Sequence, residues 1–204
     1  MPRFFDLLLM AIAAPILLPV FFITALLVRL NLGSPIFYRQ QRGGYLGKRF
    51  EIVKFRSMTN QRDAGGQLLP DADRLTSFGK FLRSASLDEL PCFWNVLTGE
   101  MAIVGPRPFI ADYLSLYTAE QMTRHNARPG ITGWAQINGR NALSWEEKFA
   151  FDVWYVNNRS FWLDVRILFL TVKKVIVRHG ISADNDDTMP RFTGTTTQTN
   201  SELK

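Results

Sequence analysis

The sequence predicts an α+β protein made mostly of helices, and three observations support this fold class. A run of 22 residues, 7–28, contains no charged side chain, and roughly 20 apolar residues suffice for a helix to cross a bilayer. Two short strand-like segments flank the Gly-rich stretch 43–47, as in a small β-hairpin. Several later segments carry apolar residues at helical spacing, and one of them suits an amphipathic interfacial helix.

The apolar run favours a membrane helix over two alternatives. A cleavable signal peptide fits poorly, because the run is too long and only one basic residue, Arg3, precedes it. A buried soluble helix is disfavoured because apolar residues cover all faces of a run of this length. Pro15 and Pro19 lie in the middle, where each removes a backbone donor, so a kinked spanning helix and a re-entrant helix both remain open. Basic residues from Arg29 to Arg56 place the next segment on the cytoplasmic side.

These patterns divide the chain into three parts. Residues 1–30 form the membrane helix, residues 31–182 form a membrane-associated cytoplasmic domain, and residues 183–204 form a polar tail. The tail is poor in apolar residues, so we expect it to be disordered.

Within the middle part, the hairpin strands are expected at Ile36–Gln41 and Phe50–Arg56, and one interpretation is an ordinary hairpin with a solvated basic face. Leu75, Phe78 and Leu82 have the spacing of an amphipathic helix.

Three further segments have distinct patterns. "TAEQM" and "SWEEKF" each place a hydroxyl residue three positions before Gln or Glu, which predicts two helix starts. "RPGITGWAQINGR" lies between them and is expected to be an irregular loop because it is rich in Gly and Pro. Residues 160–180 form a long helix that either lies in the membrane interface or packs in the core.

Charge and cysteine content narrow the possible partners. The formal charge of +6 and pI near 9.7 suit an anionic partner, but no nucleic-acid recognition element is present in the sequence, so phosphorylated small molecules and lipid headgroups are favoured. Cys92 is the only cysteine, which excludes an intrachain disulfide. Together with His125 and His179 it falls short of a zinc site.

The adjacent acids Asp88 and Glu89 are the candidate catalytic residues. A helix is expected to start near them, because Pro91 tolerates only a first-turn position, and to end before Gly99. Carboxylates at a helix start are commonly caps, which is the ordinary interpretation.

The neighbouring cations favour chemistry on a phosphate ester. Arg83 precedes the acid pair, and Arg107 lies in the stiff turn "GPRP". A carboxylate attacks phosphorus only when the phosphoryl oxygens are neutralised, which Mg²⁺ and Arg can do. The product is an acyl phosphate, which divides a difficult transfer into two easier steps.

Three motifs, "KFRSM", "SLDELPCFWNVLTGEMAIVGPRP" and "RPGITGWAQINGR", follow the apolar N-terminus in this order. With them, the chain from about Arg3 to about Ile181 resembles the bacterial sugar transferases, which are monotopic polyprenyl-phosphate phosphoglycosyl transferases. The short chain most resembles the PglC-like form. The resemblance implies transfer of a phosphosugar from a UDP-sugar to undecaprenyl phosphate at the cytoplasmic face of the bacterial inner membrane, which starts glycan assembly and releases UMP.

The resemblance also implies roles for individual residues. Asp88 would be the nucleophile that carries the phosphosugar and contacts Mg²⁺, and Glu89 would hold the metal or handle the acceptor's proton. Arg83 and Arg107 would bind substrate phosphate. Two further cations, Lys54 and Arg56, would make substrate, headgroup or structural contacts.

The family's N-terminal helix is re-entrant and broken at a Ser-Pro pair. In this chain Leu18-Pro19 stands at that place, with Pro15 added.

The short form suggests a UDP-linked diacetylbacillosamine donor, with galactose or N-acetylgalactosamine as alternatives, and the sequence gives no indication of oligomeric state. Three rival functions remain. They are a membrane-anchored binding or scaffold protein, a different lipid-phosphate enzyme such as a phosphatase, and the same transfer without a covalent intermediate.

Overall fold

The computed structural model describes residues 1–139, 142–177 and 191–195, and its fold is α+β and mostly helical, as predicted. In these residues two small sheets occur, an antiparallel pair of β1 (Phe37–Gly43) with β2 (Arg49–Phe55) and a parallel pair of β3 (Ala102–Val104) with β4 (Gly130–Thr132). The helices described are α1 Arg3–Leu32, α2 Asp71–Arg74, α3 Ser77–Ser84, α4 Cys92–Thr98, α5 Ala119–Met122, α6 Trp134–Asn138, α7 Trp145–Asn158 and α8 Phe161–Val177. Short 3₁₀ turns are η1 Tyr45–Gly47, η2 Leu87–Glu89, η3 Ala111–Leu116 and η4 Thr123–Asn126.

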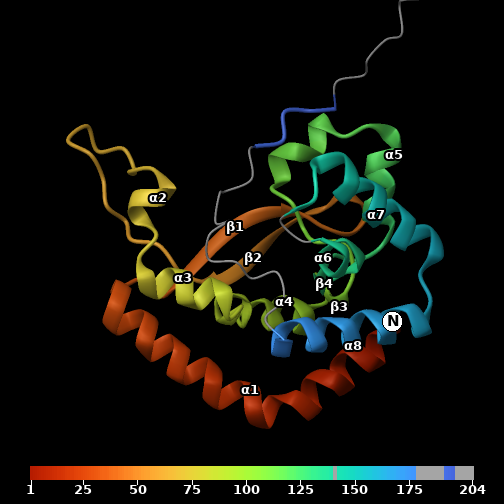
Figure 1. Ribbon diagram of the computed structural model, residues 1–204, viewed down its shortest axis with the longest axis horizontal. Helices are drawn as coiled ribbons and strands as arrows, with labels where there is room; N and C mark the ends of the chain where they lie inside the picture. Colours follow the sequence, from red (N-terminus) through yellow and green to blue (C-terminus); the bar gives the residue numbers. More distant parts are fainter. Residues whose placement is uncertain (140–141, 178–190, 196–204) are drawn as a thin grey trace, which may run out of the picture.

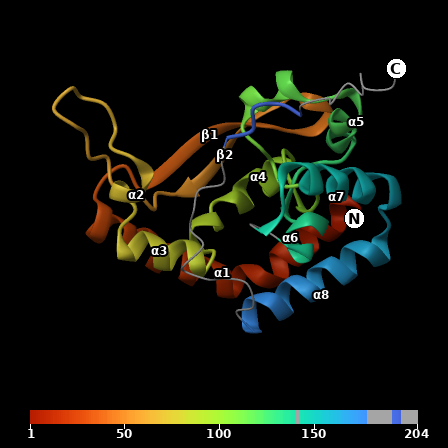
Figure 2. The same cartoon turned by 45° about the horizontal axis from the view of Figure 1, so that its top comes forward.

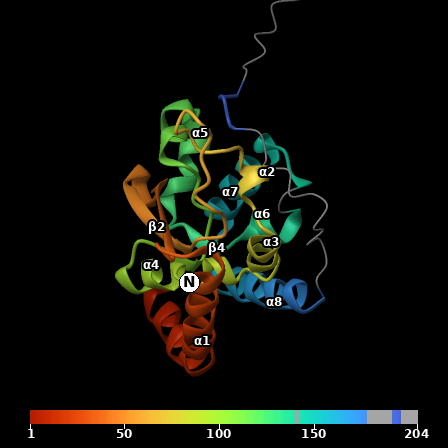
Figure 3. The same cartoon turned by 90° about the vertical axis from the view of Figure 1, so that its left-hand side faces the viewer.

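The N-terminal helix α1 is one long, bent element that lies beneath the rest of the molecule (Figure 1). Both of its ends rise toward the body, and its vertex points away from it. Pro15 and Pro19 lie inside the helix near its middle, and prolines there cause kinks because they remove backbone hydrogen bonds and clash with the preceding turn. Figures 1 and 3 both place α3, α4 and α8 on the side of the body that faces α1.

Most of the apolar surface of α1 is not covered by protein. The helix is long and apolar enough to cross a membrane, and only 11% of its most apolar window is buried. The rest of the described chain therefore does not bury α1 in the way that the core helix of a soluble protein is buried. The exposed large apolar side chains of α1 are Phe4, Leu7, Leu8, Ile12, Ile16, Leu18, Phe22, Ile23, Leu26, Leu27 and Leu30.

Polar contacts hold both ends of α1 to the body. Near its start, Arg3 donates to the carbonyl of Leu97 at 2.8 Å, and buried Asp6 accepts from the N–H of Ile103 at 3.1 Å. At its end, the guanidinium of Arg56 donates to the carbonyl of Leu32, one of the four orphan carbonyls of a helix terminus. The bend therefore lies between two fixed ends.

The predicted hairpin is confirmed within one or two residues at each strand end. Its antiparallel register pairs Phe37 with Phe55 and Gly43 with Arg49. The inward side chains of β2, including Phe50 and Ile52, are buried against α4. Figure 2 shows the hairpin crossing above α4, with β1 running from the α3 side toward α5.

The predicted helix starts are confirmed, with one shift. Thr118 and Ser144 each form a complete capping box, at α5 and α7. The amphipathic helix begins at Ser77 because the hydroxyl of Thr76 caps it, accepting from Gly79 N–H at 3.1 Å. Leu75 therefore lies just before the helix that the sequence assigned it to.

The segment "RPGITGWAQINGR" is not the irregular loop that we expected, because it contains β4 and α6. Gly130 of this segment and Gly105, which follows β3, allow the parallel β3–β4 pair to form at close range. A Cβ added to Gly105 would lie 2.2 Å from the carbonyl oxygen of Arg128, and one added to Gly130 would lie 2.1 Å from the nitrogen of Gly105. Only glycine fits this close backbone approach, so Gly130, which contributed to the prediction of a loop, lies at a strand contact instead.

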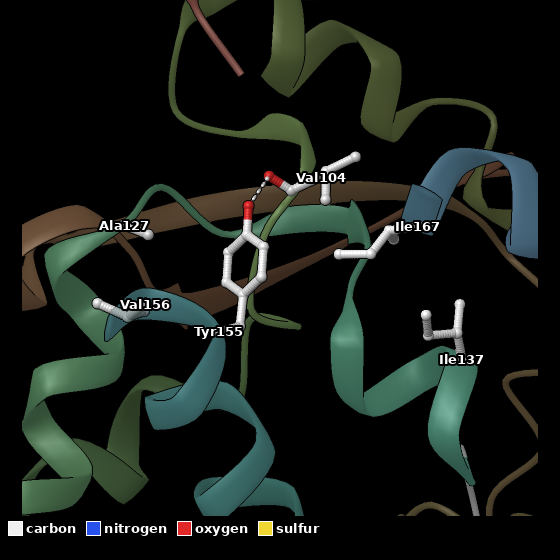
Figure 4. Packing of buried hydrophobic residues seen from close by; sticks show 6 residues of the cluster. All are labelled: Val104, Ala127, Ile137, Tyr155, Val156 and Ile167. Atoms are coloured by element: carbon white, nitrogen blue, oxygen red, sulfur yellow. Dashed lines mark hydrogen bonds between the residues drawn. The ribbon is translucent and has the colours of Figure 1, made fainter. Parts of the chain in front are cut away.

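Helix α8 packs by one side only. Ile167 is fully buried in a cluster with Val104 and Tyr155 (Figure 4). The hydroxyl of Tyr155 donates to buried Asp164 at 2.7 Å and lies 3.5 Å from the carbonyl oxygen of Val104, the contact drawn in Figure 4. The opposite side of α8 exposes Trp162, Phe169, Val172 and Val175. Core packing, one of the two alternatives for this helix, is thus confirmed on one side, and the other side carries the exposed apolar residues that an interfacial helix needs.

Most of the tail that we predicted to be disordered, residues 183–204, lies outside the described residues. In the described part, Phe192 is buried against Tyr113, Phe149 and Trp145. The amide of Gln121 donates to the hydroxyl of Thr195 at 2.7 Å.

Candidate active site

Asp88 and Glu89 lie on the 3₁₀ turn η2, directly before α4. The turn follows Ser86, whose positive φ of 55° redirects the chain at the end of α3, and it is closed by a bond from Glu89 N–H to the Ser86 carbonyl at 3.3 Å. Neighbouring residues of a 3₁₀ turn project about 120° apart. The two carboxylates consequently have different surroundings.

Glu89 is held by two cations from distant parts of the chain. Its Oε1 lies 2.6 Å from Lys54 Nζ of β2 and 2.8 Å from Arg107 Nη2, which follows β3. Burial would raise the pKa of Glu89, but the charges of Arg107 and Lys54 outweigh burial and hold this pKa well below its usual value. Glu89 is therefore a fixed negative charge.

Asp88 is buried, and no hydrogen bond or ion pair joins its carboxylate to any part of the chain that the structure describes. Burial is the main cause that raises the pKa of Asp88, and the neighbouring charge of Glu89 adds to it. Lys54, Arg107 and Arg83 oppose this rise, in that order. A desolvated carboxylate without a partner is a reactive group, because no bond must break before it acts.

Both predicted phosphate-binding arginines lie close enough to Asp88 for their charges to lower its pKa. Arg107 lines a small pocket with Lys54 and Glu89. Arg83, at the end of α3, donates from Nε to the hydroxyl of Ser57 at 3.0 Å, which leaves both of its terminal nitrogens for other partners. The structure thus brings Asp88, Glu89, Lys54, Arg83 and Arg107 together.

Arg56 is placed elsewhere. Its guanidinium is buried and donates to the carbonyls of Leu32 and Ser34, at the junction between α1 and β1. It does not line the pocket that Lys54 and Arg107 share. Arg56 therefore holds the junction between α1 and β1 together, and in this structure it makes no contact in the pocket of Lys54 and Arg107.

Two features of the site were missed by the sequence analysis. Arg42 of β1 lines the pocket, but in the sequence it was one of several basic residues in the hairpin. Arg124 forms a buried ion pair with Asp152 at 2.6 Å and donates to the carbonyl of Arg107 at 2.5 Å, which fixes the backbone that carries Arg107. No local pattern signals this pair, because 28 residues separate its members.

Helix capping does not account for the acid pair. The residue at the N-cap of α4 is Pro91, which has no side-chain hydrogen bond to the helix. The Oε1 of Glu89 is occupied by two cations. The arrangement instead places a buried carboxylate among cations that could neutralise the oxygens of a phosphate, which is what attack on phosphorus requires.

Comparison with known proteins agrees with this chemistry. A family model described as "Bacterial sugar transferase" matches residues 1–178. EpsL of Bacillus subtilis strain 168, named an uncharacterized sugar transferase, is 58% identical over 171 residues, which cover 84% of this chain and 85% of EpsL.

Two longer relatives have names that state a reaction. The UDP-glucose:undecaprenyl-phosphate glucose-1-phosphate transferase of Xanthomonas campestris pv. campestris is 41% identical over 182 residues, which cover 84% of this chain and 38% of that protein. The UDP-N-acetylgalactosamine-undecaprenyl-phosphate N-acetylgalactosaminephosphotransferase of Aeromonas hydrophila is 39% identical over 186 residues, which cover 87% of this chain and 44% of that protein. The chain thus spans less than half the length of these two relatives. The family match and the identities show that this chain belongs to the bacterial sugar transferase family.

Proposed function

We propose that this chain is a phosphoglycosyl transferase that moves a phosphosugar from a UDP-sugar to undecaprenyl phosphate and so starts the assembly of a glycan. The family and the reactions in the relatives' names support this reaction class. The observation that carries it for this chain is the buried carboxylate of Asp88, without a partner among the described residues, beside the pairs that Glu89 forms with Lys54 and Arg107.

The proposed reaction has two steps at Asp88. A carboxylate oxygen attacks the phosphorus that bears the sugar, the bond from this phosphorus to the bridging oxygen breaks, and UMP leaves with the electron pair. An oxygen of undecaprenyl phosphate then attacks the same phosphorus and displaces the carboxylate of Asp88. Arg83 and Arg107 would bind the phosphate oxygens, and the charges of both lie near Asp88. The nucleophile must be ionised, and Lys54 lowers the pKa of Asp88 most among the nearby charges.

A magnesium ion fits this donor set. Mg²⁺ commonly binds one or two protein carboxylates together with substrate phosphates and water. Asp88 has no competing partner in the described chain, and Glu89 uses Oε1 for its two cations, which leaves Oε2. When bound, the ion would neutralise charge on the diphosphate.

We further propose that α1 is a re-entrant membrane helix and that the domain lies on the cytoplasmic face of the inner membrane. The bend of α1, its exposed apolar surface and the polar contacts that hold both of its ends to the body support this arrangement. The exposed apolar face of α8 would lie in the same interface. An acceptor that is dissolved in the lipid would explain why the active site lies at the surface of the bilayer.

The relatives' names guide the choice of donor. They contain glucose and N-acetylgalactosamine, whereas neither name contains diacetylbacillosamine, the donor that the short form suggested. A donor panel therefore starts with UDP-glucose and UDP-N-acetylgalactosamine and adds the galactose and diacetylbacillosamine donors.

The test is UMP release by the purified full chain with undecaprenyl phosphate, Mg²⁺ and each UDP-sugar. Asp88→Asn is compared with Asp112→Asn, a change at an exposed aspartate of η3. We expect UMP from at least one donor, lost in Asp88→Asn and kept in Asp112→Asn. Folded chain that yields no UMP from any donor would favour a binding or scaffold protein, and release of inorganic phosphate from undecaprenyl phosphate without a donor would indicate a phosphatase.

A further inference from the structure

Arg42 lies near the end of β1 and faces the same pocket as Lys54, Glu89 and Arg107. Its Nη1 donates to the carbonyl of Pro108 at 3.2 Å, and its Nη2 donates to Oε1 of Gln40 at 2.5 Å. These two bonds orient the guanidinium, but neither acceptor carries a charge.

Arg42 has no counter-ion in the described residues. None of the ion pairs found there includes it, and its Nε is buried without a hydrogen-bond partner. Glu89, the carboxylate in the same pocket, is already shared by Lys54 and Arg107. Burial, with the nearby charge of Arg107, lowers the pKa of Arg42. A cation that is partly buried without a counter-ion destabilises a fold, so its position is better explained by a negative charge that a ligand supplies.

The charge of the pocket as a whole points to the same conclusion. Three cations, Arg42, Lys54 and Arg107, line it together with one carboxylate, Glu89. Positive charge therefore remains after the existing ion pairs are counted. The planar guanidinium has a fork of donors that matches two oxygens of a phosphate, whereas an isolated carboxylate ligand would leave part of this charge unpaired.

The position of Arg42 favours the donor's phosphates over the acceptor's. In Figure 1, β1 rises from beside the carboxyl end of α1 toward α5, so the strand end that carries Arg42 lies farther from the vertex of α1 than the start of the strand does. The acceptor phosphate is attached to a lipid chain and enters from the bilayer. A water-soluble nucleotide can reach the other end of the pocket.

We propose that Arg42 binds the diphosphate of the nucleotide donor and stays on the phosphate of UMP as it leaves. The inference rests on the proposed function. When the bond between the sugar-bearing phosphorus and the bridging oxygen breaks, the electron pair stays on that oxygen, so UMP gains one negative charge there. The guanidinium of Arg42 pairs with this new charge. Its interaction with the phosphate is therefore stronger in the transition state than in the bound donor.

The test measures UDP binding, which needs neither the right sugar nor turnover. Full-length chain in detergent is titrated with UDP by calorimetry, as wild type, Arg42→Gln and Arg42→Lys. The matched control is Arg39→Gln, because Arg39 is on the same strand but is exposed and paired with Glu51 at 2.7 Å. We expect the Kd for UDP to rise about 10- to 100-fold in Arg42→Gln, the loss typical of a charged hydrogen bond. Arg42→Lys should recover part of the lost affinity for UDP, and Arg39→Gln should bind UDP with the Kd of the wild type.

Kinetics separate the two phosphate sources. With an active donor, Arg42→Gln should raise the KM for the UDP-sugar and lower kcat, while the KM for undecaprenyl phosphate stays unchanged. Unchanged UDP affinity in Arg42→Gln overturns the proposal, as does a rise in the acceptor's KM alone, which would assign Arg42 to the lipid phosphate. If Arg42→Gln does not fold, equal UDP affinity in wild type and Arg42→Lys overturns it.

The proposed function fails by a different result. A wild type that binds UDP but releases no UMP from any donor contradicts the transfer, and the calorimetric comparison still decides the role of Arg42. A wild type that does not bind UDP contradicts the Arg42 proposal itself.

Discussion

Arg107 Nη2 lies 2.8 Å from Oε1 of Glu89, although 18 residues separate the two in the sequence. The same oxygen accepts from Lys54 at 2.6 Å. Glu89 therefore joins the hairpin strand β2 to the segment after β3 and fixes two cations beside Asp88. This makes Glu89 a counter-ion that positions the site, and its depressed pKa makes it a poor base at neutral pH.

Replacing Lys54 with Gln should shift the acid limb of the pH–rate profile to higher pH. Lys54 is the charge that most lowers the pKa of Asp88, so without it the nucleophile ionises at higher pH. We expect kcat/KM at pH 7 to fall about 10- to 100-fold, as for loss of one charged contact. The profile of UMP release measures both effects, and Lys48→Gln, at an exposed position of the same hairpin, is the control. An unmoved acid limb would mean that Lys54 does not act on Asp88.

Replacing Glu89 with Gln should shift the acid limb of the pH–rate profile to lower pH. The charge of Glu89 raises the pKa of Asp88, so its removal lets Asp88 ionise at lower pH. The rate should still fall about tenfold, because Arg107 and Lys54 lose the partner that positions them. Rapid-quench measurement of UMP separates this role from that of a base: a normal first step with slow transfer to the acceptor would show that Glu89 handles the acceptor's proton instead.

Asp88→Asn should abolish transfer and yet stabilise the fold by about 1 kcal/mol, because a buried carboxylate without a partner is replaced by a neutral amide. The pKa of Asp88 is raised in the folded state, so between the unfolded and folded pKa values the native protein binds more protons. Its stability therefore falls as pH rises through this window. The stability gain of Asp88→Asn should be absent below that window and complete above it. Thermal unfolding of both forms across this pH range measures the difference, and a variant less stable than wild type at pH 7 would contradict the account.

Arg56→Gln should destabilise the protein by about 2 kcal/mol without moving the pH–rate profile. The buried guanidinium donates to the carbonyls of Leu32 and Ser34, and the loss leaves acceptors at the end of α1 unsatisfied. Thermal unfolding and the UMP assay, run on the same preparation, give the two quantities. A raised donor KM with unchanged stability would instead place Arg56 at the substrate.

Much of the fold could be predicted because its signals are local. The uncharged run, the hairpin pattern and the hydroxyl–Glu or hydroxyl–Gln spacings each lie within a few residues, and each marks an element that the structure contains. The three-residue strands β3 and β4 are too short to show periodicity. Their glycines have the composition of a loop, and the close backbone contact between Gly105 and Gly130 becomes visible only in three dimensions.

The site could be predicted only in part for the same reason. Asp88 and Glu89 are conspicuous because they are adjacent and Pro91 follows closely. The partners of Glu89 come from 35 and 18 residues away, so no spacing rule connects them. Arg42 stands in a basic hairpin, where its lack of a counter-ion becomes evident only after the other cations are seen to be paired.

The bent α1 predicts that both of its ends lie on one side of the membrane. Single cysteines at Pro2 and Ser115, both exposed, would report the start of α1 and the domain. The native Cys92 should not be labelled by a maleimide, because it is buried and burial raises the pKa of its thiol to about 12. An impermeant maleimide should label both introduced cysteines in inverted vesicles and neither in right-side-out vesicles. Labelling of Pro2→Cys in right-side-out vesicles would show a spanning helix, and Pro15→Ala with Pro19→Ala should increase that fraction.

A single-turnover experiment with an active UDP-sugar and no acceptor shows directly whether Asp88 carries the phosphosugar. We predict a burst of UMP approaching one per chain and a mass increase of one phosphosugar on the peptide that contains Asp88. Adding undecaprenyl phosphate should then remove the added mass. UMP that appears only after the acceptor is added, with Asp88 unmodified throughout, would contradict the covalent mechanism.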